Sequence, residues 1–199
     1  MEAQMKIAAA KRVDRRKFVA MLLDRIPDAL VISGLGSPTY DVFAAGDRDR
    51  NFYLWGAMGA ASMVGLGLAL ARPERRVLVA TGDGEMLMGL GSLATIGAER
   101  PPNLAVAVFD NGRYGETGMQ ESHTDCGISL AGVARACGIE QVCDVADEAG
   151  LRDFAARLAG FESTLFARIA IAADDKPRVL PSRDGALLKT RFRTALGAG

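Results

Sequence analysis

The chain has 199 residues, of which 49% are hydrophobic and 24% charged, a composition typical of a folded globular domain. Lys and Arg together number 24, as do Asp and Glu, so the overall charge gives no support for binding nucleic acid or an anionic membrane. Three cysteines without a CxxC pair favour free thiols over a disulfide framework or a zinc site. The longest apolar run, 57–71, is shorter than the ~20 residues that span a bilayer. We therefore expect a cytoplasmic protein without membrane contact.

The hydrophobic pattern predicts helices and strands that alternate along the chain. In chain order, it predicts a helix over 14–27, a strand over 29–33, a helix after Pro38, a strand over 51–55, a Gly/Ala-rich helix over 57–71, a strand over 76–81, a helix over 85–98, a strand over 104–109, a polar glycine-rich stretch over 110–127, a helix over 129–137, a strand over 139–142, a helix over 147–159, a strand over 164–171 and a short helix over 184–195. Several of these strands are apolar throughout, as are strands buried on both faces of a parallel sheet.

This alternation predicts a three-layer α/β/α fold with a central, mostly parallel sheet. We expect residues 1–175 to form a single domain and residues 176–199 a polar tail or short helix. Ligands of such sheets bind at the carboxyl ends of the strands, and the glycine-rich segments of this chain fall there.

The strongest chemical signal is Gly82-Asp83-Gly84 after one apolar strand, with Asn111 after the next. The glycines permit a tight turn and close backbone approach, and the amides of the helix that follows favour an anion such as a diphosphate. Asp83 and Asn111 would offer oxygen ligands at the same edge of the sheet, and oxygen ligands suit Mg²⁺. Each motif alone is typical of a simple turn, but their joint placement at strand ends favours one metal–diphosphate site.

This pattern resembles the signature of thiamine diphosphate (ThDP) dependent enzymes. The segments GDGEMLMGLGSLATI and FDNGRYGETGMQ are similar to the branch that contains the sulfopyruvate decarboxylase β subunit and phosphonopyruvate decarboxylase. The segment 55–59 (WGAMG) is similar to the one that precedes the signature in decarboxylases and acetolactate synthases. The resemblance covers residues 30 to 125, and its central motif is specific to the cofactor class rather than to the substrate.

The resemblance implies a role for each matching position. The Mg²⁺ ion would be held by the side chains of Asp83 and Asn111 and by the carbonyl of Arg113. Met58 would support the bent conformation of the cofactor, and the carbonyl of Gly56 would accept a hydrogen bond from its aminopyrimidine. The positions around the diphosphate would be Gly36, Ser37, Gly82, Gly84, Glu85 and Tyr114.

Two positions depart from the family pattern. Glu85 stands where many relatives have serine, which would put a second negative charge near the phosphates, and Asp110 replaces the first Asn of the common Asn-Asn pair. His123, the only histidine, is, with Glu116, the candidate for catalytic proton transfer, a role that histidine often takes in enzymes.

An anionic substrate would need cationic partners. Arg113 and Arg48 are the only arginines of this chain expected near the site, and a partner subunit is the alternative source of cationic residues. The basic residues 15–17 are interpreted as a solvated helix face.

In the family, a glutamate from a separate pyrimidine-binding domain activates the cofactor. Only ~30 residues precede the first predicted strand, too few for such a domain. The resemblance therefore implies an α subunit that supplies this glutamate within an α₂β₂ or larger hetero-oligomer. The implied reaction is ThDP- and Mg²⁺-dependent decarboxylation of a small 2-oxoacid, such as sulfopyruvate or phosphonopyruvate, to an aldehyde.

Three alternatives remain open. The first is a carboligase subunit of the acetolactate synthase type on the same scaffold. The second is a dinucleotide-binding oxidoreductase, supported only by Gly34-Leu35-Gly36, with Thr39 where the third glycine of that fingerprint belongs. The third is a non-catalytic regulatory subunit, which would have no need of Asp83 and Asn111.

Overall fold

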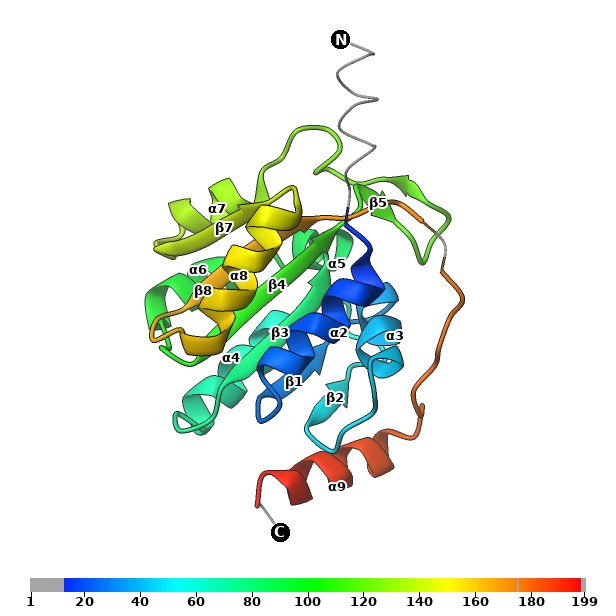
Figure 1. The fold of residues 1–199 in the computed structure, drawn as a ribbon, viewed down its shortest axis with the longest axis vertical. Helices are drawn as coiled ribbons and strands as arrows, with labels where there is room; N and C mark the ends of the chain where they lie inside the picture. The colour runs from blue at the N-terminus through cyan, green and yellow to red at the C-terminus, as the bar shows by residue number, and fades with distance from the viewer. Residues whose placement is uncertain (1–12, 175, 198–199) are drawn as a thin grey trace.

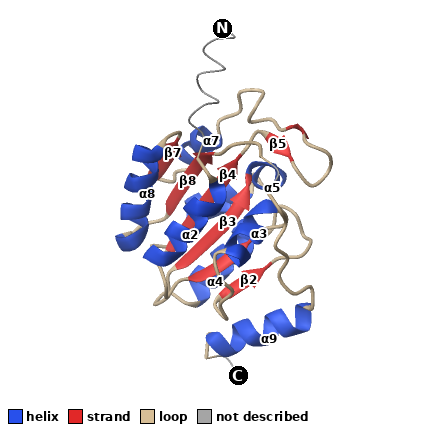
Figure 2. Ribbon diagram, turned by 45° about the vertical axis from the view of Figure 1, so that its right-hand side comes forward, coloured by secondary structure: helices blue, strands red, loops and turns tan. Residues whose placement is uncertain are grey.

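The computed structural model describes residues 13–174 and 176–197. Its centre is a six-stranded sheet in the order β2-β1-β3-β4-β8-β7, in which all neighbouring strands run parallel (Figures 1 and 2). The strands of this sheet are β1 (Leu30–Ser33), β2 (Asn51–Tyr53), β3 (Val77–Gly82), β4 (Leu104–Asp110), β7 (Gln141–Val145) and β8 (Leu165–Ala170). A small antiparallel hairpin, β5 (Arg113–Tyr114) with β6 (Gln120–Glu121), follows β4. The predicted fold class is confirmed.

Helices cover both faces of the sheet, as Figure 1 shows. One face carries α2 (Arg15–Arg25), α3 (Ser37–Ala44) and α8 (Glu148–Gly160), and the other carries α4 (Ala61–Ala71), α5 (Asp83–Met88), α6 (Ser92–Glu99) and α7 (Leu130–Ala136). Residues 105, 107 and 109 of β4 join the first core and residues 104, 106 and 108 the second, because successive side chains of a strand point to opposite faces. Among the described residues, no helix is long and apolar enough to cross a membrane.

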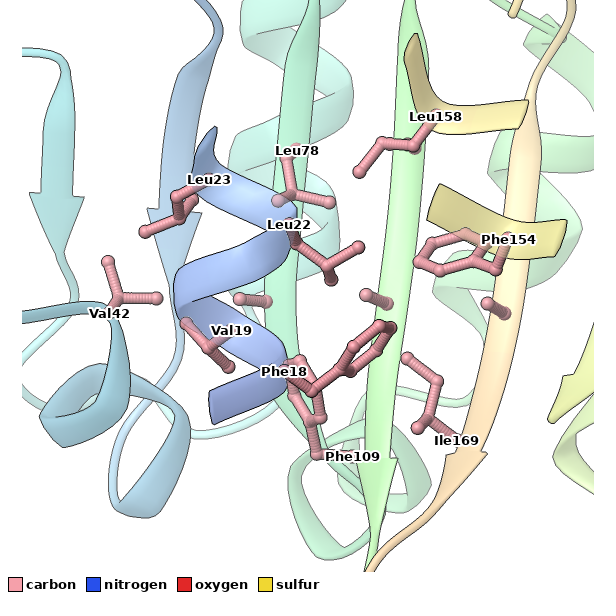
Figure 3. Close-up of a cluster of buried hydrophobic side chains, with 14 of the residues drawn as sticks. Phe18, Val19, Leu22, Leu23, Val42, Leu78, Phe109, Phe154, Leu158 and Ile169 are labelled. Atoms are coloured by element: carbon pink, nitrogen blue, oxygen red, sulfur yellow. The ribbon is translucent and has the colours of Figure 1, made fainter. Parts of the chain in front are cut away.

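Helix α2 forms the centre of the first core. Its Phe18, Leu22 and neighbouring apolar residues point towards the sheet between α3 and α8 (Figure 3). The Phe18 ring lies edge-on to Phe109 of β4, with 6.4 Å between the centroids. The helix begins where the sequence predicts, because the side chain of Asp14 accepts a hydrogen bond from the Lys17 amide.

The helix predicted over 85–98 is wrong as a single element. It is two helices, α5 and α6, separated at Gly89–Gly91. A Cβ atom on Gly89 would lie 2.1 Å from the carbonyl oxygen of Gly59, so the backbone of the loop before α4 presses directly on the break. This contact requires glycine, and the two short helices turn at it.

Residues 176–184 run along the side of the molecule to α9 (Gly185–Ala195), which lies beside β2 (Figure 1). The Trp55 indole donates a hydrogen bond to the Ser182 carbonyl at 2.7 Å. Phe192 of α9 packs on Phe52 of β2, with ring centroids 5.3 Å apart. The helix predicted over 184–195 is confirmed, and it covers an edge strand that would otherwise present unpaired backbone groups.

Two glycines of α4 provide a matched test of the packing of this helix on β3. A Cβ on Gly65 would lie 2.2 Å from Cγ2 of Val79, whereas a Cβ on Gly67 would meet no atom within 4 Å. We expect Gly65→Ala to lower the free energy of unfolding by about 1–3 kcal/mol through overpacking. Gly67→Ala should raise it by about 0.5–1 kcal/mol, because alanine loses less backbone entropy in a helix. Urea unfolding of both variants measures this difference, and equal effects would contradict the seating of α4 on β3.

Candidate functional site

A cavity of about 260 Å³ lies at the carboxyl edge of the sheet. It is lined by residues from 35–38 after β1, 82–85 after β3 and 111–117 after β4. The strand order reverses between β1 and β3, since β2 extends the sheet on one side of β1 and β3 on the other. The crevice at such a reversal is the usual ligand site of open α/β sheets.

Most of the predicted site residues line this one cavity. They are Gly36, Ser37, Met58, Gly82, Asp83, Gly84, Glu85, Asn111, Arg113, Tyr114 and Glu116. Gly56 and His123 are not among the lining residues. His123 is exposed, but its Nδ1 lies 3.0 Å from the hydroxyl of Tyr114, which is part of the wall.

Asp83 is a buried carboxyl at the end of β3, with 2% of its surface exposed. Its Oδ2 accepts a hydrogen bond from the Ser122 hydroxyl and lies 3.3 Å from the Thr124 hydroxyl. Burial raises the pKa of Asp83 to about 6; the Ser122 hydrogen bond opposes this shift, and the negative charge of Asp110 adds to it. The backbone amide of Asn111 also reaches this carboxyl, so the end of β4 lies next to the end of β3. Such a carboxylate, desolvated and without a cationic partner in the described part of the chain, favours a metal ion beside it.

The turn after β4 is held by its own side chains. Oδ1 of Asp110 accepts hydrogen bonds from the Gly112 amide at 2.9 Å and the Thr124 hydroxyl at 2.8 Å. Oδ1 of Asn111 accepts the Arg113 amide at 2.9 Å, and Gly112 adopts a φ of 71°. An amide oxygen has two lone pairs, so this hydrogen bond leaves Asn111 one lone pair for a metal ion.

Arg168 of β8 supports this turn, although it is not among the residues predicted from the sequence. Its Nε donates to Oδ2 of Asp110 at 2.6 Å, and its Nη1 lies 3.4 Å from Oδ1 of Asp144 on β7. Asp110 is only 2% exposed at its side chain, so the guanidinium neutralises a buried charge beside Asp83. The signal in the sequence is a lone arginine within the otherwise apolar strand LFARIA.

The side chain of Glu85, which lines the cavity, is held by contacts with Thr81 and Gly34. Its carboxyl is buried, accepts a hydrogen bond from Thr81 Oγ1 at 2.7 Å and lies against Gly34, where a Cβ would be 1.5 Å from Oε2. Burial raises the pKa of Glu85, while the Thr81 hydroxyl and the backbone of Gly59 and Ala61 favour its charged form. The carboxyl therefore connects α5 to β3, to Gly34 after β1 and to the loop before α4.

Glu116 lies over the turn after β1. A Cβ on Gly36 would be 3.1 Å from Oε1 of Glu116, and Oε2 of Glu116 is 3.4 Å from the Tyr40 hydroxyl and 3.9 Å from Nη2 of Arg178. The expected cationic role of Arg48 is wrong. Arg48 binds Asn51 and Pro27, which places it at the amino ends of β1 and β2, opposite the cavity.

Comparison with known proteins adds to this geometry. Residues 39–169 match the family described as thiamine pyrophosphate enzyme, C-terminal TPP binding domain. The sulfopyruvate decarboxylase subunit beta of Methanococcus maripaludis is 42% identical over 149 residues, which cover 75% of this chain and 78% of that protein. The phosphonopyruvate decarboxylase of Streptomyces viridochromogenes is 38% identical over 193 residues, which cover 93% of this chain and 47% of that protein.

Solved structures agree on the fold. The benzoylformate decarboxylase of Polynucleobacter necessarius superposes with a TM-score of 0.66 at 19% identity, over 83% of this chain and 34% of that chain. A 4-hydroxybenzoylformate decarboxylase of Rhodococcus jostii gives a TM-score of 0.68 at 18% identity, over the same shares. This chain thus spans about a third of the length of these enzymes.

Proposed function

Because the chain belongs to the thiamine pyrophosphate enzymes, through their C-terminal cofactor-binding domain, we propose that it is the diphosphate- and metal-binding subunit of a 2-oxoacid decarboxylase. One observation carries this proposal. Asp83 and Asn111 come from the ends of neighbouring strands and line the same cavity as the glycine turns at 36 and 82–84. A carboxylate, an amide and exposed backbone in one crevice suit a divalent cation together with a diphosphate.

The residues present fit both groups. Gly36, Gly82 and Gly84 all line the cavity, and Gly82 leaves its backbone open, since a Cβ there would meet no described atom nearer than 3.9 Å. Gly36 and Gly84 instead make room for the side chains of Glu116 and Tyr114. Asp83, Asn111 and the carbonyl of Arg113 are the proposed ligands of Mg²⁺. The proposed diphosphate contacts are Gly36, Ser37, Gly82, Gly84 and Glu85, with Tyr114 packed beside them, and the proposed aminopyrimidine contacts are Gly56 and Met58.

When bound, the cofactor supplies the electron sink that allows a 2-oxoacid to lose carbon dioxide. The residues of this chain would bind and orient the cofactor and the substrate, and they would move protons. Tyr114 lines the cavity and its hydroxyl lies 3.0 Å from Nδ1 of His123, which supports this pair as the proposed proton connection between solvent and the reaction site. Glu116 is the other proposed proton carrier, because its carboxyl lies beside the Gly36 turn.

We further propose that the active enzyme is a hetero-oligomer, α₂β₂ or larger. Several relatives at about 40% identity are themselves named as β subunits. The partner would be a pyrimidine-binding α subunit that supplies the activating glutamate. Met88, which lines the cavity and is 62% exposed, would be covered by the partner in this assembly. The proposed substrates are sulfopyruvate- or phosphonopyruvate-like 2-oxoacids.

Reconstitution with the co-purified pyrimidine-binding subunit tests this function. We expect the complex to release carbon dioxide and an aldehyde from sulfopyruvate when ThDP and Mg²⁺ are present, and to lose this activity with EDTA. The chain alone should be inactive, and activity without a partner would contradict the proposed assembly. Formation of acetolactate from pyruvate, without any aldehyde from sulfopyruvate, would assign the chain to the carboligases instead.

A further inference from the structure

Arg15, the first residue of α2, is buried in the wall of the cavity. Only 3% of its surface is exposed, and it lines the cavity beside Ser37 and Pro38. The interpretation of Arg15 as part of a solvated helix face is therefore wrong. Arginine is almost never buried so fully without a partner that satisfies its charge.

The partner of Arg15 is a carboxylate that it shares with a second arginine. Asp41 of α3 is fully buried, and it accepts hydrogen bonds from Nε of Arg15 and, at 3.0 Å, from Nε of Arg16. Arg16 also donates to the Pro177 carbonyl at 2.8 Å. Two guanidinium groups against one carboxylate leave one positive charge in this cluster of Arg15, Arg16 and Asp41.

The remaining donors of Arg15 are available to a ligand. Its hydrogen bond to Asp41 uses Nε, and the described residues provide no further hydrogen-bond partner for its two terminal nitrogens. The other arginine that lines the cavity, Arg113, differs in this respect, because its terminal nitrogens pair with Glu121 and Asp125 at 3.1 Å each. The planar guanidinium presents a fork of N–H groups that matches the paired oxygens of a phosphoryl, phosphonate or sulfonate group.

We propose that Arg15 binds a tetrahedral oxyanion inside the cavity, with Asp41 as the residue that positions it. In this cavity the anion is either the terminal phosphoryl group of the cofactor or the charged tail of the substrate. The excess charge and the partial removal of water strengthen this attraction relative to an exposed arginine. The proposal rests on the proposed function, since both anions come from it.

The test compares Arg15→Met with Arg16→Met in the complex with the pyrimidine-binding subunit. Both variants remove one positive charge from the cluster, but only the first changes the wall of the cavity. Loss of a bidentate, charge-assisted contact should weaken binding by about 10- to 100-fold. The first measurement is the Kd for ThDP with Mg²⁺ by calorimetry. The second is kcat and KM for sulfopyruvate and for pyruvate, which has no anionic tail.

The two sources of the anion give different results. If Arg15 binds the phosphoryl group, Arg15→Met raises the Kd for ThDP and leaves the ratio of the two KM values unchanged. If Arg15 binds the tail, the Kd for ThDP is unchanged and the KM for sulfopyruvate rises while that for pyruvate does not. Arg15→Met that matches Arg16→Met in all these constants would overturn the proposal.

Arg15→Lys separates a loss of binding from a folding defect. It keeps a cation near Asp41 but lacks the paired N–H donors of the guanidinium. We expect it to retain the melting temperature and to lose most of the affinity, and full affinity would overturn the proposal. Failure of the wild-type complex to bind ThDP at all would instead refute the proposed function, so the two failures are distinguishable.

Discussion

Replacement of Asp83 by asparagine is expected to abolish Mg²⁺-dependent ThDP binding and, at the same time, to stabilise the metal-free chain at neutral pH. The loss of binding follows because Asp83 is the only carboxylate among the proposed ligands. The gain in stability follows from burial, since burial raises the pKa of Asp83 to about 6. A buried charge that the function requires thus lowers the free energy of unfolding of the chain.

The direction in which stability changes with pH follows from proton binding to Asp83. Between about pH 4 and pH 6 the folded state holds the Asp83 proton more firmly than the unfolded state, so stability falls as pH rises through this window. Above about pH 6 the destabilisation is complete, and it amounts to at most about 3 kcal/mol at about 1.4 kcal/mol per pKa unit. Asp83→Asn should therefore raise the free energy of unfolding by about 1–3 kcal/mol at pH 7 and by much less at pH 4.

Urea unfolding in EDTA at both pH values, with calorimetric titration of ThDP in the presence and absence of Mg²⁺, measures both effects. Asp153→Asn is the control, because this exposed carboxylate on α8 pairs with no described residue except Arg157 and its replacement should change neither property. Metal-dependent binding that survives in Asp83→Asn would exclude Asp83 as a ligand. A stability gain of equal size at both pH values would contradict the raised pKa.

Arg168→Met is expected to lower the free energy of unfolding by about 2–4 kcal/mol, because it leaves the buried carboxylate of Asp110 without its cation. The same carboxylate holds the Gly112 amide and the Thr124 hydroxyl. Its disturbance should therefore also displace Asn111 and weaken Mg²⁺-dependent ThDP binding by about tenfold, which is about 1.4 kcal/mol.

The control is Arg157 on α8, whose replacement removes an exposed ion pair rather than a buried one. Arg157 and Asp153 form a pair of similar length, 2.9 Å, with side chains that are 48% and 57% exposed, so Arg157→Met should cost less than about 1 kcal/mol. The double variant Asp110→Asn/Arg168→Met should recover much of the lost stability, because asparagine needs no cation. If Arg168→Met costs no more than Arg157→Met, then Arg168 does not stabilise the turn.

The sequence predicts the elements whose signals are local. Helix α2 is recognisable from Asp14 at its start and Pro27 after its end, and the strands of the sheet from apolar runs that stop at glycine or polar residues. Among the strands, β7 is predicted least accurately, since it begins at Gln141 rather than at Ile139. The Ile139 amide instead bonds to the Ala134 carbonyl and completes the end of α7, a capping arrangement that apolarity alone does not reveal.

Features that depend on contacts between distant segments could not be predicted in this way. The break between α5 and α6 is caused by the Gly59 backbone, thirty positions earlier in the chain. The burial of Arg15 depends on where the first turn of α2 lies relative to the cavity, and the role of Arg168 on the alignment of β8 with β4. The cofactor class is readable because the proposed ligands Asp83 and Asn111 directly follow strands, whereas the side chains around them come from distant segments, such as Arg168 of β8.

The contact between Gly59 and Gly89, together with the Glu85 carboxyl beside the same loop, has a consequence for affinity. It joins the segment that carries Met58 to the helix that carries Asp83. In the proposed binding mode, the separation of the cofactor contacts at Met58 and Asp83 would thus be set by backbone packing before the ligand binds. Little conformational freedom remains to be lost on association, so more of the gross interaction energy is retained as affinity.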